Sequence, residues 1–168
     1  MNQIPAYPLK QVIEVKQRRV EDAERVVKEK QLALEREKEK LVQREAERDQ
    51  VKNHKKDKLK QLRDTMDAGT TAPKIQQMKV YLKVVDEKLK IEEKKVKDQQ
   101  EQVEIANKNL EQAKEDLRIK RQEVDKLLSH KKDWEKEARK ELEIVEGREQ
   151  DELGSIIYAS QHKKSNKR

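Results

Sequence analysis

The sequence predicts an all-α protein, in which two long antiparallel helices form a coiled-coil hairpin with a longer C-terminal arm. Charged residues make up 46% of the chain and hydrophobic residues 32%, with no Phe and one Trp, so a globular core cannot be filled. Leu and Val recur every seven residues, as in helices that meet along a narrow apolar seam. The stretch MDAGTTAPKI, at 66–75, contains a Gly, two Thr and a Pro within five consecutive positions. We therefore expect a single hairpin domain over residues 1–168, bent once at this stretch.

The first helix is predicted over residues 9–67. Pro5 and Pro8 mark its start, since proline is tolerated before and within a first helical turn. One set of heptad positions holds apolar residues seven apart, namely Ile13, Val20, Val27, Leu34 and Leu41. The companion set is mostly charged. So thin an apolar stripe is marginal in isolation, and the helix needs a partner.

The connection is predicted over residues 68–73. Gly69 can adopt the left-handed conformation that ends a helix, and Thr70 or Thr71 can cap the next one. Pro73 is compatible with a first helical turn. A connection of this length usually returns the chain antiparallel, so we predict the bend of a helical hairpin here.

The second helix is predicted over residues 74–159, followed by a basic tail at 160–168. One set of its heptad positions reads Ile75, Leu82, Leu89, Val96, Val103, Leu110, Leu117 and Val124, and the companion set runs to Trp134. A symmetric bend would pair residues whose numbers sum to about 140. In that register nearly every layer joins a large apolar residue to a small, long-stemmed or polar one, and Arg48 faces Glu92. Beyond about residue 131 the second helix outruns the first.

The densest apolar patch outside the heptads lies in this extension, at Leu153, Ile156, Ile157 and Tyr158. Unpaired apolar surface at an end favours a protein partner. The alternative is that Ile4, Ala6 and Tyr7 fold back over the patch.

Trp134 is a second candidate contact, because Trp is favoured as an interface anchor. The alternative is a packing cap against Pro5 and Pro8 at the open end of the hairpin.

No set of residues points to catalysis, a metal or a cofactor. The chain has no Cys, and its three His, at 54, 130 and 162, lie far apart. Acids and bases alternate, so no stripe tracks the phosphates of a nucleic acid, although the tail residues Lys163, Lys164, Lys167 and Arg168 offer a weak contact. No apolar run approaches the roughly 18 residues of a membrane span. We expect a soluble cytoplasmic protein that is not an enzyme.

The opening YPLKQVIEVKQRRVEDAERVV, at 7–27, resembles the YscO/FliJ family of type III secretion and flagellar export. The similar positions are Pro8, Leu9, Val12, Ile13, Arg18 or Arg19, Glu21, Ala23 and Val27. The unequal lengths of the two predicted helices and the Lys/Glu-rich composition agree with a resemblance to this family. The resemblance implies a protein like the central stalk of rotary ATPases, whose end with both termini enters the export ATPase ring. It also implies contacts with the export gate and with secretion chaperones.

On this resemblance we expect a non-enzymatic stalk and escort protein that works through protein contacts. The expected partner-binding residues are Leu9, Ile13, Trp134, Leu153, Ile156, Ile157 and Tyr158. One alternative is a generic structural coiled-coil scaffold, and another is binding of the tail to nucleic acid or to an anionic membrane. A hairpin can be monomeric, whereas two parallel helices would need two chains.

Overall fold

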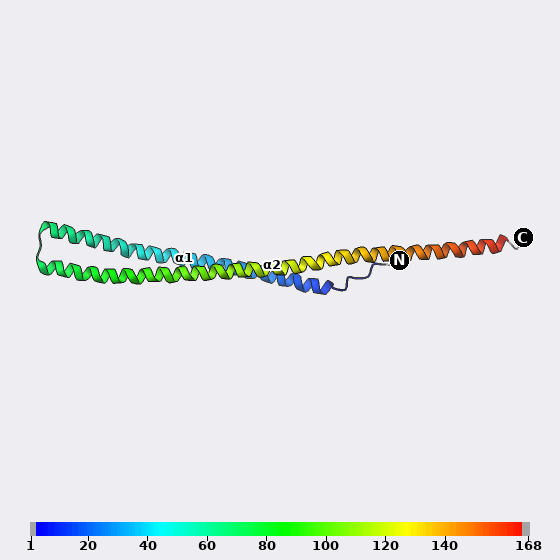
Figure 1. Ribbon diagram of the computed structural model, residues 1–168, viewed down its shortest axis with the longest axis horizontal. Coiled ribbons are helices and arrows are strands. Elements are labelled where there is room, and N and C mark those ends of the chain that lie inside the picture. Colours follow the sequence, from blue (N-terminus) through cyan, green and yellow to red (C-terminus); the bar gives the residue numbers. More distant parts are fainter. Residues whose placement is uncertain (1–2, 166–168) are drawn as a thin grey trace. The chain divides into compact units, whose positions relative to one another are not determined.

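The computed structural model describes residues 3–165, which form two antiparallel helices joined by a tight turn (Figure 1). Helix α1 spans Lys10–Ala68 and helix α2 spans Ala72–Ser165. No strand occurs between residues 3 and 165. The predicted all-α hairpin with a longer C-terminal arm is confirmed.

The chain divides into two compact units, which we describe separately. The turn unit comprises residues 24–116, and the terminal unit comprises the residues up to Ala23 together with those from Leu117 onward. The expectation of one domain over the whole chain stays a prediction.

The turn is shorter than predicted, occupying residues 69–71 rather than 68–73. Gly69 has a φ of 83°, the left-handed conformation expected of it, and its N–H donates to the Met66 carbonyl at 3.3 Å. The carbonyl of Thr71 accepts from the N–H groups of Lys74 and Ile75, at 3.2 and 3.3 Å. Helix α2 begins before Pro73 because the first amides of a helix have no intrahelical acceptor, so the missing N–H of proline costs nothing there.

The other helix ends also differ from the prediction. Helix α1 begins at Lys10 rather than residue 9 and ends at Ala68 rather than 67. Helix α2 continues to Ser165 instead of stopping at 159, because residues 160–165 contain neither Pro nor Gly to end it. Part of the predicted tail is therefore helical, while Lys167 and Arg168 lie outside the described residues.

The seam of the turn unit follows the predicted heptads. Its buried apolar residues are Leu34, Leu62, Val85, Leu89, Val96, Leu110 and Ala113. Gln99 Nε2 donates across the seam to the carbonyl and to Oε2 of Glu37, at 3.0 and 2.6 Å, and Lys55 pairs with Asp86. The residue numbers of these two pairs sum to 136 and 141. The hairpin register predicted from a symmetric bend is thus close to the observed one.

One predicted layer is arranged differently. Arg48 donates to Asp49, its neighbour in the chain, at 3.1 Å, and Lys95 donates to Glu92 at 3.0 Å. Arg48 and Glu92, which were predicted to face each other, therefore each form a hydrogen bond within their own helix. Side chains three positions apart on a helix readily meet, as Lys95 and Glu92 do here, and such a contact competes with pairing across the seam.

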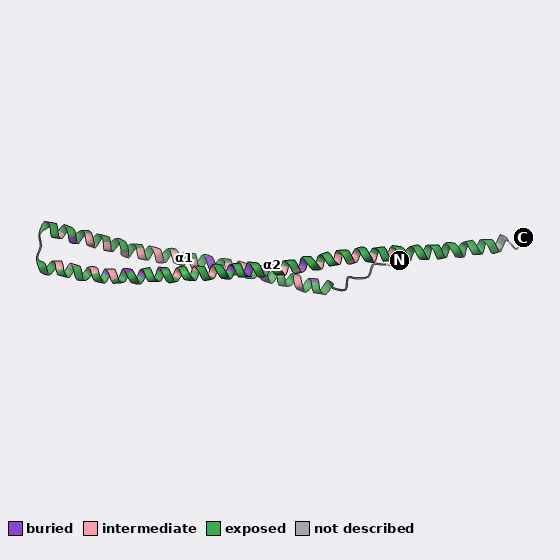
Figure 2. Cartoon of the chain, in the orientation of Figure 1, coloured by how far each residue is buried: buried purple, intermediate pink, exposed green. Residues whose placement is uncertain are grey.

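The terminal unit pairs the beginning of α1 with the middle of α2. Ile13, Ala23, Leu117 and Val124 are buried, and Lys16 pairs with Glu123 at 2.8 Å. Every residue from 143 to 163 is exposed, and Figure 2 shows this arm of α2 in the colour of exposed residues. The longer arm thus carries a helix with no helical neighbour within the described chain.

Candidate protein-binding site

The seven residues predicted to bind partners all belong to the terminal unit, but their surroundings differ. Ile13 is only 6% exposed, so its side chain contributes to the seam rather than to an open surface. Leu9 is 37% exposed and precedes the first residue of α1. Four residues are largely open to solvent: Leu153, Ile156, Ile157 and Tyr158. These four residues and Leu9 are the most exposed of the seven.

Trp134 belongs to an aromatic cluster that holds the N-terminal segment against α2. The Tyr7 hydroxyl lies 2.6 Å from His130 Nδ1, and the Tyr7 ring packs edge-on against Trp134 with 5.5 Å between ring centroids. Tyr7 is 6% exposed, which is unusual for a residue outside both helices. The segment before α1 is therefore anchored chiefly through Tyr7.

Sequence reasoning missed this cluster, although a signal was present. The numbers of Tyr7 and His130 sum to 137, close to the predicted sum of about 140, but Tyr7 precedes the predicted first helix and so was not placed in a layer. A polar aromatic residue just before a helix, level with a His and a Trp, was the available clue.

The alternative in which the N-terminal residues cover the C-terminal apolar patch is wrong. Tyr7 contacts residues at 130 and 134, whereas the patch begins at Leu153. Ile156 is 66% exposed and Tyr158 is 68% exposed. Nothing among residues 3–163 shields the patch, since its members remain largely open.

A groove runs along α2 beside the N-terminal segment. Its lining residues are Gln3, Pro5, Trp134, Glu137, Ala138, Glu141, Leu142, Val145 and Glu149. The apolar members are spaced three or four residues apart along α2, so they share one face of the helix. The groove was not anticipated, because it needs both the register and the path of residues 3–9.

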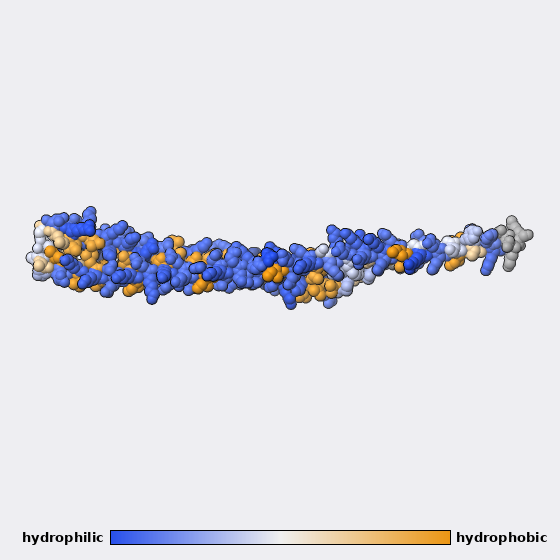
Figure 3. All heavy atoms as spheres, in the orientation of Figure 1, coloured by the Kyte–Doolittle hydropathy of each residue, from blue (hydrophilic) through white to orange (hydrophobic). Residues whose placement is uncertain are grey.

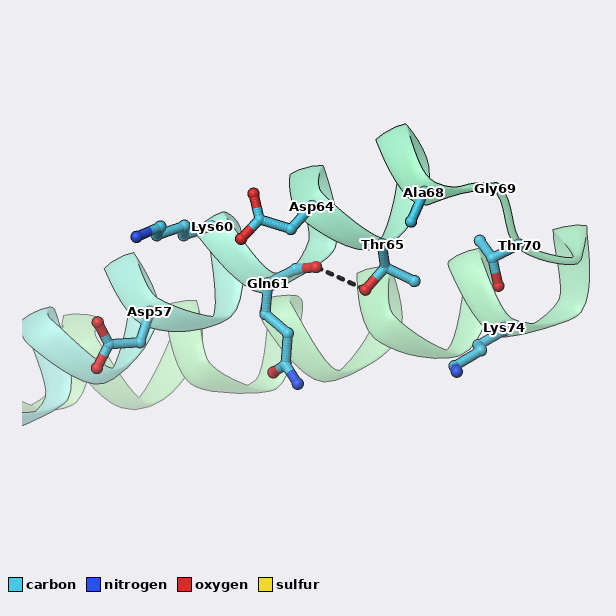
Figure 4. Close-up of a pocket in the computed structure, with 9 residues that line it drawn as sticks. All are labelled: Asp57, Lys60, Gln61, Asp64, Thr65, Ala68, Gly69, Thr70 and Lys74. Atoms are coloured by element: carbon cyan, nitrogen blue, oxygen red, sulfur yellow. Dashed lines mark hydrogen bonds between the residues drawn. The ribbon is translucent and has the colours of Figure 1, made fainter.

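A second hollow lies at the turn and is lined mainly by polar side chains. Figure 4 shows that Asp57, Lys60 and Asp64 lie at successive places along α1 and that their side chains do not meet at one point. Thr65 Oγ1 donates to the Gln61 carbonyl at 2.7 Å, a local contact within α1. These residues do not converge on a common point, so the hollow has no arrangement suited to chemistry.

Glu37, Asp86 and Glu123 each have a lowered pKa, and each of these carboxylates is part of an ion pair or hydrogen bond. The pKa of Glu37 is lowered by its hydrogen bond from Lys40 and then by that from Gln99. Hydrogen bonding and charge from Lys55 lower the pKa of Asp86, and those from Lys16 lower the pKa of Glu123. All three shifts are explained by structural pairs.

Two further features bear on the kind of site. Within residues 3–163, no cluster of three or more His, Asp and Glu side chains is arranged to hold a metal ion. In the same part of the chain, neither helix has a segment long and apolar enough to cross a membrane. What the terminal unit offers is an apolar patch on an exposed helix, together with a groove lined partly by Glu side chains, and both suit protein contacts.

Comparison with known proteins gives the family. The profile described as YscO-like protein matches residues 4–164. The solved structure of CT670 from Chlamydia trachomatis, described as a YscO homologue, is 47% identical with a TM-score of 0.91, covering 95% of this chain and 98% of that one. A chain from the CdsV and CdsO complex of Chlamydia pneumoniae is 52% identical with a TM-score of 0.48, covering 50% of this chain and 98% of that one. None of the curated protein sequences matches. With nearly all of its length matched, the chain belongs to the YscO-like family of type III secretion proteins.

Proposed function

We propose that this protein is a non-enzymatic, cytoplasmic component of type III secretion that serves as the central stalk of the export ATPase ring. The observation that carries the proposal is the exposed apolar end of α2, at Leu153, Ile156 and Ile157, in a chain of the YscO-like family. A helix that exposes several large apolar side chains together is best explained by a partner that covers them.

A slim helical element suits this role for a physical reason. Inside a ring of like subunits, a single asymmetric helix contacts each subunit differently, and it favours whichever conformation binds it best. Leu9 would add apolar surface beside the N-terminal segment, with Tyr158 and Trp134 as aromatic contacts. Ile13 would act indirectly by holding α1 against α2, since its side chain is buried.

Escort of secretion chaperones and contact with the export gate form the second half of the proposal. They are supported by the family resemblance alone, and no residue is assigned to them. These two roles require partners from the secretion apparatus, whereas the role of a generic scaffold does not.

The test uses the purified full chain and its cognate export ATPase. The triple substitution Leu153→Gln, Ile156→Gln and Ile157→Gln should lower both capture of the ATPase and stimulation of ATP hydrolysis at least about tenfold, because burying such side chains contributes roughly 1.5–3 kcal/mol each. A matched variant, Val80→Gln, Val84→Gln and Ile91→Gln, removes three similarly exposed apolar residues of the turn unit and should leave both intact. If deletion of residues 146–168 leaves binding and stimulation unchanged, the stalk assignment is wrong and a scaffold role becomes the better account.

A further inference from the structure

We propose that the groove on the terminal unit binds a basic amphipathic helix from another protein, which lies along α2 where α1 is absent. The site is distinct from the apolar end at 153–158, and the proposal does not require the ATPase ring to be the source of that helix.

The seam of α2 continues beyond the start of α1. Helix α1 begins at Lys10, and Tyr7 is already level with His130 and Trp134. The seam nevertheless extends through Ala138 and Leu142, which are half-buried, to Val145, which is exposed. A helical seam of this spacing is complete only when a second helix packs on it.

The groove has two walls, one from α2 and one from the N-terminal segment. Tyr7 is fixed by His130 and Trp134, and this places Gln3 and Pro5 along the groove opposite α2. The N-terminal segment is not helical, so it borders the seam without filling it. Figure 3 shows small apolar patches among hydrophilic residues along the arm of α2 that leads to the C-terminus.

The charge of the groove selects the class of partner. Three of the nine lining residues are acidic, Glu137, Glu141 and Glu149, and none is basic. The stretch from 141 to 152 contains six acids, at 141, 143, 146, 149, 151 and 152, against the single base Arg148. The whole chain has a net charge of +7, so this stretch is opposite in sign to the chain as a whole. Lys and Arg stems on a partner helix would cover the apolar floor while their charged ends meet these carboxylates.

The basic tail of the chain itself is a poorer occupant. Residues 163–168 read KKSNKR and contain no large apolar side chain to place against Leu142 or Val145. Helix α2 also continues unbroken to Ser165, so the tail cannot turn back before that point. A helix with both basic and apolar faces therefore has to come from another molecule.

The single Trp of the chain lies in the groove, which makes its fluorescence a direct reporter. The probes are two synthetic three-heptad peptides with Leu at the seam positions, one with Lys and one with Glu at the flanking positions. Titrated against the full chain at 50 mM NaCl, the Lys-flanked peptide should shift Trp134 emission and bind at least about tenfold more tightly than the Glu-flanked peptide. The difference should shrink at 500 mM NaCl, where charges are screened.

Charge reversal supplies the decisive comparison. The variant Glu137→Lys, Glu141→Lys and Glu149→Lys should invert the preference, so that the Glu-flanked peptide binds more tightly. The control Glu39→Lys, Glu93→Lys and Glu101→Lys makes the same charge change at exposed positions of the turn unit and should keep the original preference. Circular dichroism of both variants checks that the helices remain folded.

Three results would overturn the proposal. They are equal binding of the two peptides, an unchanged preference after reversal in the groove, and concentration-dependent self-association that shields Trp134 without any peptide. The last would make a second copy of the chain the occupant. Because no ATPase is present, these outcomes are independent of the test of the stalk function.

Discussion

At the scale of single residues, the seam tolerates polar side chains where each finds a partner. Gln99 lies at a heptad position and satisfies its amide by two bonds to Glu37 on the opposite helix. Glu92 lies at another such position and is only 8% exposed, but it has only Lys95 as a partner for one oxygen. Its second oxygen, Oε2, is buried without a hydrogen bond. A half-satisfied buried carboxylate is unfavourable, since desolvation is not fully offset.

The substitution Glu92→Leu should therefore raise the free energy of unfolding by about 1 kcal/mol, because replacing a buried charge by a well-packed apolar residue is often stabilising. Thermal unfolding followed by circular dichroism measures the effect. Glu93→Leu, at the exposed neighbouring position, is the control and should change stability little. A loss of stability in Glu92→Leu would mean that this carboxylate has a favourable interaction beyond Lys95.

At the scale of the elements, the sequence determined where helices form, while their ends followed finer rules. Glycine and threonine at 69–71 were correctly assigned to the bend, and Gly69 has the left-handed φ that ends a helix, whereas Pro73 lies in the first turn of α2. The ends shifted by one to six residues because a first turn accommodates Pro73 and because residues 160–165 offer no stop signal. Glycine is expected to affect stability differently at two kinds of position in this chain. It is favourable where the backbone is left-handed, as at Gly69, and unfavourable within a helix, as at Gly147.

Two glycine substitutions should change stability in opposite directions. Gly69→Ala should lower the free energy of unfolding by about 1 kcal/mol, because a side chain is disfavoured at a φ of 83°. No atom would clash with the added Cβ, so the loss is conformational. Gly147→Ala, within helix α2 and also free of clashes, should raise local helix stability by up to about 1 kcal/mol.

Urea unfolding measures Gly69→Ala, and amide hydrogen exchange around residue 147 measures Gly147→Ala. Equal effects at the two positions would contradict the left-handed conformation of the turn.

At the scale of the whole molecule, pairing between α1 and α2 is partly electrostatic. Lys16 pairs with Glu123 in the terminal unit, and Lys55 pairs with Asp86 in the turn unit. The pKa values of both carboxyl groups are lowered in the folded chain. These ion pairs are partly exposed to solvent, so each contributes only modestly to the free energy of unfolding. Their main effect is to favour the observed register of α1 against α2.

Acidification should consequently weaken the hairpin. A carboxyl group whose pKa is lowered on folding contributes stability at pH values above its usual pKa, which is 4.5 for Glu and 3.8 for Asp, and this is lost as the pH falls through the lowered value. The melting temperature should therefore be steady at neutral pH and decline below about pH 4.5. The double variant Lys16→Gln and Lys55→Gln should show a shallower decline than the parent chain. An equally steep decline in both would assign acid sensitivity to other carboxylates.

The fold was predictable from particular residues. The heptads from Ile75 to Val124 fixed the seam of α2, and the bend at Gly69 fixed the direction of return, so the register followed within a few residues. The exposed patch at Leu153 to Tyr158 was also located correctly in the sequence, and its role as a partner site remains a prediction. These features could be predicted because helix geometry and the order of residues along the chain are both set by the local sequence.

What the sequence by itself determined is the number of helices, the place of the bend and the face of each helix that is buried, because heptad spacing and turn residues encode them directly. Only the tertiary structure decided how residues 3–9 pack, that Tyr7 joins His130 and Trp134, and that an acidic groove remains beside them. The physical reason is that an irregular segment has no periodicity to read. Its path is set by contacts with residues more than a hundred positions away, which exist only once the two helices have come together.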